Sequence, residues 1–324
     1  MKVLVDEMSN SECHSRQADL RKIMEYHLYM KVAIYQEMKT QSEAEDFEVY
    51  NALKRRNDIE SVTFVNPKKL KIRILDGEIS FEIGEIALHK ANFDVLFVRG
   101  GFTNKPTLIE VVKHCRKNGI KVFDNNFSEI KYLINKRADY IKLGEAGIII
   151  PNTYIFSNDE DILDSNLQYP LVMKTTNTGK GKNIFMVHSN EEVIEICMQK
   201  EKSIESFVLQ ELIDYEHDLR VLVCGDKVLG CMKRIPKNGD FRANFSLGGN
   251  VEPFEATSEI KNLAIKAARA CELDIAGVDI LVERNNGKLW CLEANRTPGL
   301  KAITQALGQQ ISDKVVEFML KNAN

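Results

Sequence analysis

One stretch of this chain decides its fold: GVDILVERNNGKLWCLEAN, residues 277–295. Two apolar runs, residues 278–282 and 289–292, flank the turn signal Asn285-Asn286-Gly287, so the stretch predicts a β-hairpin. With the turn centred near Asn286, Asp279 lies within one residue of the position directly opposite Glu293. Asn295 follows Glu293 by two residues and therefore shares its face of the strand.

These side chains predict a site for a divalent cation. Asp279, Glu293 and Asn295 offer only oxygen ligands, with no His or Cys among them. A small set of hard oxygen ligands suits Mg²⁺, which keeps several waters and is shared with substrate phosphates. Asp279 alone would more often be an ordinary surface carboxylate. The three residues together, with Pro298-Gly299-Leu300 following, favour the metal site.

Two further hairpins are predicted on the N-terminal side of this one. Residues 171–174 and 184–187 flank a polar loop, and residues 220–224 and 228–232 flank a Gly225-Asp226 turn. A helix over residues 260–271 carries apolar side chains on one side. Paired strands with tight turns and occasional helices predict an α+β organisation from about residue 170 onward.

The chain before residue 134 has a different pattern. Strands are predicted at residues 30–35, 94–98 and 120–124, and helices at 43–56 and around Leu108, Val111, Val112 and Cys115, which recur on one helical face. Strand, helix and strand in short order predict a parallel α/β domain. Residues 1–29 precede the first predicted core strand and are expected to form an appendage.

Composition narrows the class of protein. In 324 residues, 44% are hydrophobic and 28% charged, which is enough for a buried core and excludes a mostly disordered chain. The net charge of −3 gives no electrostatic reason to expect a nucleic acid or a membrane surface as partner. Seven Cys residues, never spaced as C-x-x-C, indicate buried free thiols and a cytoplasmic location.

A glycine-rich loop, Gly179-Lys180-Gly181-Lys182, follows the strand that ends near Lys174. It has neither the spacing of a P-loop nor the third glycine of a dinucleotide fingerprint. Its backbone N–H groups and ammonium groups could cover a polyphosphate. The alternative is a solvated hairpin tip.

From about Asn135 to Leu300 the chain resembles the ATP-grasp ligases, specifically the ribosomal-protein glutamate ligase branch, the RimK type. Several motifs carry this resemblance by their order and spacing: Asn135-Lys136, Pro170-Leu171-Val172-Met173-Lys174, Gln210-Glu211-Leu212-Ile213, Asp218-Leu219-Arg220, Gly239-Asp240-Phe241-Arg242-Ala243-Asn244, Gly248-Gly249, Gly277-Val278-Asp279 and Glu293-Ala294-Asn295-Arg296-Thr297-Pro298-Gly299-Leu300. The N-terminal α/β domain matches this family in pattern only.

The resemblance implies three groups of site residues. Residues implied in ATP binding contact the phosphates (Lys136, Lys174, Gly179, Gly181), the adenine edge (Gln210, Glu211, Leu212, Ile213) and the ribose hydroxyls (Asp218). Residues implied in catalysis face the transferring phosphoryl group and the substrate carboxylate: Arg220, Arg234, Arg242 and Asn244. Asp279, Glu293 and Asn295 would bind two Mg²⁺ ions, for which Mn²⁺ can substitute. Read on its own, Arg220 could instead pair with a carboxylate such as Glu211.

The expected architecture is therefore an ATP-grasp fold, α/β and α+β, in four parts: an appendage at 1–29, a parallel α/β domain at 30–134, a lid at 135–205 and a C-terminal antiparallel-sheet domain at 206–324. The resemblance implies an ATP- and Mg-dependent ligase that joins a carboxylate to an amine through an acylphosphate. The carboxylate belongs to a peptide, a protein or a small molecule, and the amine to an amino acid such as glutamate.

Two alternatives stay open. A peptide-modifying ligase would close side-chain lactams or esters, and a regulatory protein would bind nucleotide without turnover. Ser246-Leu247 stands where glutamate ligases commonly have a basic residue, which weakens the case for glutamate. The sequence also leaves a homo-oligomer open.

Overall fold

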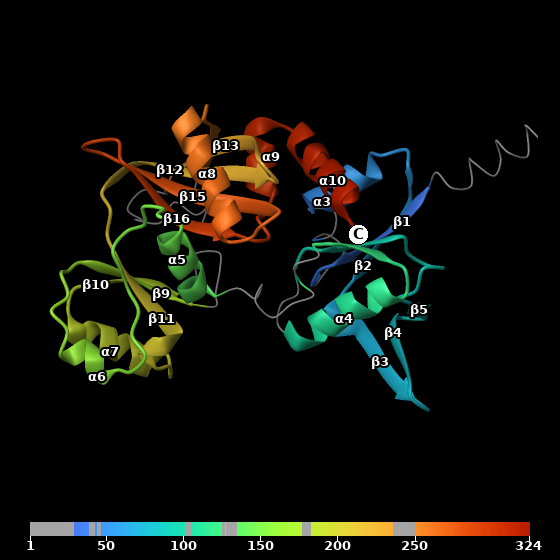
Figure 1. Ribbon diagram of the computed structural model, residues 1–324, viewed down its shortest axis with the longest axis horizontal. Coiled ribbons are helices and arrows are strands. Elements are labelled where there is room, and N and C mark those ends of the chain that lie inside the picture. Colours follow the sequence, from blue (N-terminus) through green and yellow to red (C-terminus); the bar gives the residue numbers. More distant parts are fainter. Residues whose placement is uncertain are drawn as a thin grey trace, which may run out of the picture. The chain divides into compact units, whose positions relative to one another are not determined.

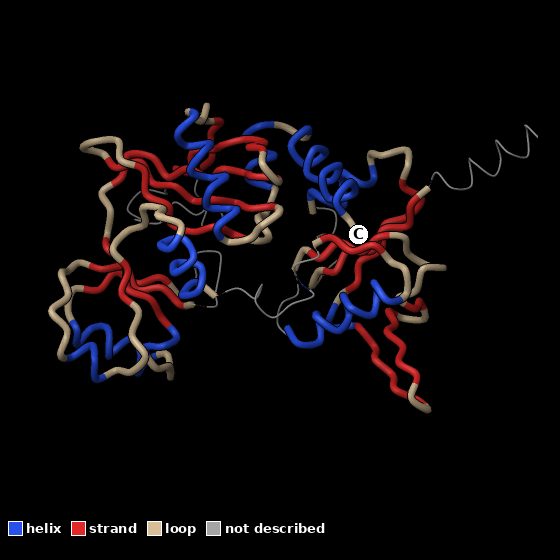
Figure 2. The backbone as a smooth tube through the Cα atoms, in the orientation of Figure 1, coloured by secondary structure: helices blue, strands red, loops and turns tan. Residues whose placement is uncertain are grey.

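The computed structural model describes residues 29–38, 43, 47–100, 105–124, 127, 135–176, 183–235 and 250–324 (Figures 1 and 2). The chain forms two compact units. The first comprises Met1–Glu45, Tyr50–Ser128 and the C-terminal Met319–Asn324, and the second comprises Asp46–Val49 and Glu129–Phe318. The predicted appendage at 1–29 lies outside the described residues except for Tyr29.

A parallel sheet in the order β2-β1-β6-β7 forms the centre of the first unit. Its elements are β1 (Met30–Tyr35), α3 (Glu48–Lys54), β2 (Ile59–Val65), β6 (Val95–Val98), α4 (Lys105–Lys117) and β7 (Lys121–Phe123). Helix α4 buries Leu108, Val111, Val112 and Cys115, so the predicted helical face is confirmed. The predicted parallel α/β domain is therefore confirmed; the predicted helix over 43–56 is described in part, as α3.

A second, smaller sheet in this unit was not among the expectations. It has the order β3-β4-β5, with η1 (Pro67–Lys69), β3 (Leu70–Leu75), β4 (Glu78–Ile83) and β5 (Ile86–Ala87). Strands β3 and β4 are joined by the turn Asp76-Gly77, and both turn residues have positive φ angles of 50° and 83°. This is the backbone that a two-residue hairpin turn requires, and Asp and Gly tolerate it better than other residues.

Two antiparallel sheets form the second unit. The first, in the order β10-β9-β11-β8, belongs to a segment with α5 (Lys136–Glu145), β8 (Thr153–Tyr154), α6 (Glu160–Leu163), β9 (Leu171–Thr175), β10 (Ile184–Val187), α7 (Asn190–Gln199), η4 (Ile204–Ser206) and β11 (Phe207–Glu211). The second, in the order β14-β13-β12-β15-β16, belongs to a segment with β12 (Tyr215–Cys224), β13 (Lys227–Ile235), β14 (Asn250–Pro253), α8 (Ser258–Ala270), β15 (Ile275–Glu283), β16 (Leu289–Asn295), α9 (Lys301–Leu307) and α10 (Gln310–Asn322). All three predicted hairpins are present as β9–β10, β12–β13 and β15–β16.

Helix α8 determines which face of the five-stranded sheet is free to carry polar side chains. Thr257 caps the helix by accepting a hydrogen bond from the Ile260 backbone N–H, and the apolar side of the helix is buried. It packs into one core with Leu219, Val221 and Val223 of β12. Because side chains alternate along a strand, the intervening residues of β12 point to the opposite face. That face carries the candidate site.

The described cysteines are buried free thiols, as predicted, at positions 115, 197, 224, 231, 271 and 291. Burial raises the pKa of Cys115 and of Cys231 to about 12, which keeps these thiols protonated and unreactive. Within the described part of the chain, no helix is long and apolar enough to cross a membrane.

Candidate active site

Strand register brings the predicted charged residues onto four neighbouring strands. Asp279 of β15 lies directly opposite Glu293 of β16 on one side and Arg220 of β12 on the other. Asp218 of β12 lies opposite Arg234 of β13. The predicted cross-strand position of Asp279 and Glu293 is confirmed. Five charged side chains that are far apart in sequence thus meet on one face of the sheet.

Asp279 is held by two guanidinium groups. Arg220 donates from Nη2 to Oδ2 at 3.0 Å and from Nε to Oδ1, and Arg234 Nη2 lies 3.2 Å from Oδ2. Arg234 also donates from Nε to Asp218 Oδ1 at 2.9 Å. Although burial alone would lower it, the pKa of Arg234 is raised by the two carboxylates, so this arginine is permanently charged.

The alternative partner considered for Arg220, Glu211, is not the one found. Glu211 Oε2 accepts a hydrogen bond of 3.3 Å from the Asn152 backbone N–H. Arg220 instead pairs with Asp279, because the antiparallel register of β12 and β15 makes the two residues direct neighbours.

Glu293 is the third carboxylate of the cluster, after Asp218 and Asp279. Lys136 Nζ lies 3.4 Å from its Oε2, and Asn295 Nδ2 donates to its Oε1 at 2.7 Å. Burial alone would raise the pKa of Glu293, but Lys136, Arg220 and the hydrogen bond from Asn295 lower it to about 2. Glu293 is therefore ionised at any physiological pH, which a metal ligand requires.

Lys174 of β9 is a further cation close to Glu293, Asp279 and Asp218. Its Nζ donates to Gln210 Oε1 at 2.6 Å, and Gln210 Nε2 donates in turn to Thr153 Oγ1 at 2.9 Å. Burial lowers the pKa of Lys174 from 10.5 to about 8, although Glu293 and two aspartates oppose this shift. Gln210 is fully buried and does not face an open pocket; its side chain orients Lys174 by accepting the hydrogen bond from Nζ.

A buried ion pair ties α5 to the residue that follows β16. Arg296 donates from Nη1 and Nη2 to Asp139 Oδ2 and Oδ1 at 3.0 and 2.8 Å. Neither residue had a role among the expectations. The signal for Arg296 was its place directly after the metal motif; Asp139, inside α5, gave no comparable signal. The pair fixes α5, and with it Lys136, against the strand that carries Glu293.

Hard oxygen donors make this cluster suitable for Mg²⁺. Asp279, Glu293 and Asn295 supply two carboxylates and one amide oxygen. The described ranges contain no group of three or more His, Cys, Asp or Glu side chains arranged to hold a metal ion, so a metal here would depend on these three residues together with water and substrate oxygens. The surrounding cations already balance the carboxylates, so a metal bound here would replace arginine and lysine contacts. Such a donor set favours Mg²⁺ over softer metals.

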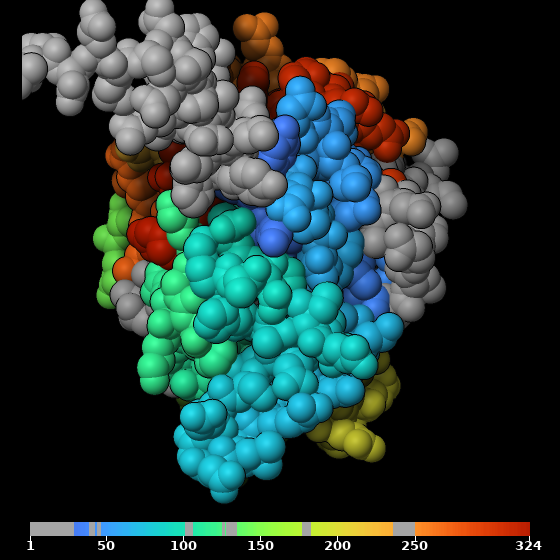
Figure 3. All heavy atoms as spheres, turned by 90° about the vertical axis from the view of Figure 1, so that its right-hand side faces the viewer, coloured from blue at the N-terminus to red at the C-terminus, as the bar shows by residue number. Residues whose placement is uncertain are grey.

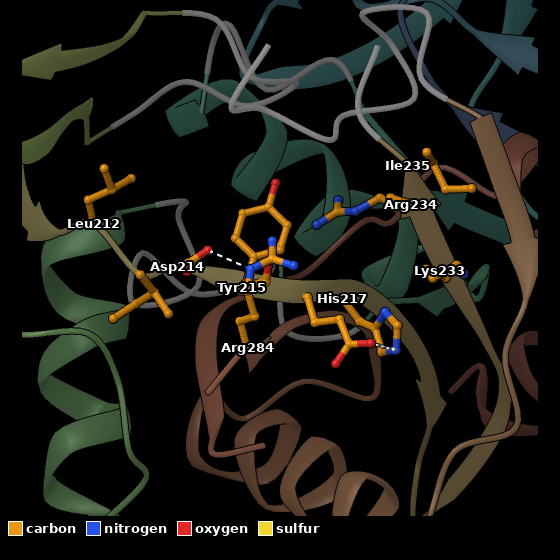
Figure 4. A pocket seen from close by; sticks show the side chains of 10 residues that line it. Leu212, Asp214, Tyr215, His217, Lys233, Arg234, Ile235 and Arg284 are labelled. Carbon is orange, nitrogen blue, oxygen red and sulfur yellow. Dashed lines mark hydrogen bonds and ion pairs between the residues drawn. The ribbon is translucent and has the colours of Figure 1, made fainter. Parts of the chain in front are cut away.

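A pocket of about 580 Å³ lies beside the cluster (Figure 4). Leu212 and Ile213, which follow β11, form one part of its wall, and Arg234 extends toward its middle from β13. Tyr215 and Arg284 also line it, and Arg284 donates from Nε to Asp214 Oδ1 at 3.1 Å. The pocket thus joins apolar side chains, an aromatic ring and guanidinium groups, which suits a heteroaromatic ring attached to an anion.

Four predicted site residues fall outside the described ranges: Gly179, Gly181, Arg242 and Asn244. The remaining predicted residues all lie in the second unit. They divide into the charged cluster (Lys136, Lys174, Asp218, Arg220, Arg234, Asp279, Glu293, Asn295), the pocket wall (Leu212, Ile213, with Arg234 shared) and the strand β11 (Gln210, Glu211).

Comparison with known proteins agrees with this geometry. The model of the RimK-like ATP-grasp domain matches residues 130–319. The chain is 30% identical over 236 residues to the probable alpha-L-glutamate ligase of Histophilus somni (strain 129Pt), which covers 71% of this chain and 77% of the relative.

Two solved structures share the fold. The RimK domain ATP-grasp protein of Sphaerobacter thermophilus DSM 20745 superposes with a TM-score of 0.63 at 18% identity, covering 90% of this chain and 99% of that one. The RiPP-associated ATP-grasp ligase of Chryseobacterium gregarium, solved with ADP and a leader and core peptide, gives 0.61 at 15% identity, covering 91% and 98%. The chain belongs to the RimK-like ATP-grasp family, whose members join a carboxylate to an amine at the expense of ATP.

Proposed function

We propose that this ligase adds the amino group of an amino acid, with glutamate as the first candidate, to a carboxyl group of a peptide, a protein or a small molecule. The relative from Histophilus somni, named a glutamate ligase, supports glutamate as that candidate. The observation that carries the proposal is the charged cluster itself. Three carboxylates and two arginines lie on one face of the five-stranded sheet, with Lys136 from α5 and Lys174 from β9 near them, beside a pocket that suits a nucleotide.

The first step of the proposed reaction brings two anions together. An oxygen of the substrate carboxylate attacks the γ-phosphorus of ATP, ADP leaves, and an acylphosphate forms. Repulsion between carboxylate and triphosphate opposes this attack, and fixed cations relieve it. We assign Arg220 and Arg234 to the reacting carboxylate and γ-phosphate, because a guanidinium donates two parallel hydrogen bonds to either group. Lys136 and Lys174 contact the phosphate chain.

Asp279, Glu293 and Asn295 would hold two Mg²⁺ ions in this scheme. When bound, the metal neutralises charge on the triphosphate as the phosphoryl group transfers. In the second step the amine attacks the carbonyl carbon of the acylphosphate, phosphate leaves, and the amine loses a proton to give an amide. The acylphosphate is easily hydrolysed, so Gly179 and Gly181 are assigned to a loop that excludes water from it. We place the reaction in the cytoplasm, since buried free thiols suit a reducing compartment.

Trapping the acylphosphate tests the proposal. ADP release should be measured with Mg-ATP and mixtures of carboxylates and amino acids, with hydroxylamine present to convert acylphosphate to hydroxamate. We expect ATP-dependent hydroxamate with at least one carboxylate, and an amide when an amino acid replaces hydroxylamine. An ester or lactam as the only product would favour the peptide-modifying alternative. Tight Mg-ATP binding without hydroxamate from any carboxylate would contradict the proposal.

The buried lysine predicts a pH dependence for nucleotide binding. With a pKa of about 8 in the free protein, Lys174 is charged at pH 7 and mostly neutral at pH 9. Above pH 8 it must take up a proton before it can pair with phosphate, so the Kd for ATP should rise by up to about tenfold per pH unit. Calorimetric titration between pH 7.5 and 9.5 measures this. Lys174→Arg stays charged and should give a nearly flat profile; an equally steep profile in that variant would rule out Lys174 as the titrating group.

A further inference from the structure

The hairpin β3–β4 of the first unit has one wholly apolar face. Direct cross-strand pairs place Leu70 opposite Ile83, Ile72 opposite Phe81 and Ile74 opposite Ile79, so these six side chains share a face. At the base of the hairpin Phe81 is buried in the core of the unit, with its ring 4.5 Å from that of His114, and Leu70 and Ile83 pack beside it.

The apolar face continues beyond the core that it helps to build. Toward the turn, Ile72, Ile74 and Ile79 are 44%, 68% and 52% exposed. Figure 3 shows the hairpin as a lobe projecting from the first unit. Ile72 and Ile74 of β3 and Ile79 of β4 thus form an exposed apolar patch on two paired strands, and such a patch commonly marks an interaction surface.

Strand β3 also offers a free edge. Within the described part of the chain, β3 pairs only with β4. Because the Asp76-Gly77 turn has two residues, Leu75 and Glu78 form the closing hydrogen-bonded pair, and alternation along the ladder leaves the backbone groups of Ile72 and Ile74 facing outward. An extended segment can add to such an edge through main-chain hydrogen bonds.

The charged side chains of β3 indicate which kind of extended segment could pair with its free edge. The other face of β3 carries Lys71 and Arg73. On the neighbouring strand β4, Glu82 lies directly opposite Lys71, and its carboxylate is 3.2 Å from Arg73 Nη1. A second β3 strand would set Lys71 and Arg73 against their own copies, and like charges directly opposite destabilise a pair. A strand that repeats the pattern of β4, with acidic residues alternating with apolar ones, would complement both faces.

We propose that β3 is a docking strand for an extended peptide in which acidic and apolar residues alternate. The peptide adds antiparallel to the outer edge of β3, covers Ile72 and Ile74 with its apolar side chains and pairs with Lys71 and Arg73 through its carboxylates. That the docked peptide carries the carboxylate to be activated rests on the function proposed above. The docking itself is independent of that chemistry.

A labelled peptide tests the docking. The probe is a fluorescein-labelled synthetic peptide with the sequence of residues 77–84, GEISFEIG, measured by fluorescence anisotropy with the full chain. Lys71→Glu should weaken its binding at least tenfold, and Ile74→Thr, which keeps a β-branched residue, several-fold. Lys117→Glu on α4 makes the same charge change at another exposed position of the unit and should bind like the parent. A probe with both glutamates replaced by lysine should bind at least tenfold more weakly.

The outcomes separate docking from catalysis. Hydroxamate formation from a small carboxylate should be the same in Lys71→Glu as in the parent, so loss of docking with retained chemistry supports the proposal. The docking proposal is overturned if the glutamate peptide and the lysine peptide bind equally well. It is also overturned if Lys71→Glu and Ile74→Thr are both folded by circular dichroism and neither weakens peptide binding. A third contradicting outcome is a parent protein that is a dimer and that Ile74→Thr converts to a monomer. The last result would make a second copy of this chain the occupant. Absence of hydroxamate with intact docking would contradict the proposed function alone.

Discussion

Replacing Glu293 by Gln should lower the turnover number on the order of 10³-fold while the protein stays folded. The substitution keeps the size of the side chain and its ability to accept a hydrogen bond from Asn295, but removes the charge that faces Lys136 at 3.4 Å. In the proposed site that charge holds the metal, and losing one preorganised electrostatic contact at a phosphoryl-transfer site costs about 10²–10³-fold or more. Hydroxamate formation at saturating Mg-ATP measures the effect.

Glu259→Gln provides the matched control. Glu259 is an exposed residue in the first turn of α8 and has no place in the charged cluster. The substitution Glu259→Gln makes the same charge change in the same unit but away from the charged cluster, so the turnover number should stay close to that of the parent. If Glu293→Gln kept more than about a tenth of the parent activity, Glu293 would not be a metal ligand.

The second large effect concerns stability. Arg296→Met should lower the free energy of unfolding by about 3–5 kcal/mol, because it leaves the Asp139 carboxylate buried without its bidentate partner. Both side chains are almost wholly buried, so water cannot replace the lost contacts. Urea denaturation of the full chain, followed by circular dichroism, measures the change.

The double variant Asp139→Leu/Arg296→Met distinguishes the ion pair from a simple packing defect. Two apolar side chains of similar volume remove the unpaired charge, and replacing a buried ion pair in this way is often neutral or stabilising. We therefore expect the double variant to recover most of the stability lost in Arg296→Met. A double variant as unstable as the single one would show that packing alone accounts for the loss.

Local patterns in the sequence predict much of the fold and the skeleton of the site. The hairpin at 277–295 has its turn marked by Asn-Gly, so counting residues places Asp279 within one residue of the position opposite Glu293. A register shift between Asp279 and Ile280, which the count does not show, makes the two residues direct partners. The pairing of Arg220 with Asp279 could not be counted in this way, because β12 and β15 are joined by a long connection whose register no turn fixes. For the same reason Asp139 and Arg296, which are 157 positions apart, meet through tertiary packing alone.

The small sheet β3-β4-β5 shows a different limit of prediction from the sequence. Residues 70–83 alternate clearly, and Asp76-Gly77 is a strong turn signal, so this hairpin was accessible to the same pattern reasoning that identified the others. Its exposed isoleucines depart from the usual pairing of apolar residues with the core. The sequence does not indicate that Ile72, Ile74 and Ile79 of this hairpin lie outside the core of the first unit. Which part of the apolar face is buried depends on how far helix α4 covers it, and that is set by tertiary packing.

The last residues of the chain return to the first unit, where Asn324 exchanges backbone hydrogen bonds with Val122 of β7. The main segment of the second unit, Glu129–Phe318, therefore lies in the sequence between two segments of the first. A recombinant fragment starting at residue 129 would carry the tail 319–324 without β7, the strand with which Asn324 forms backbone hydrogen bonds. A fragment meant to contain the second unit alone should end before Met319, and affinity tags are better attached away from Asn324.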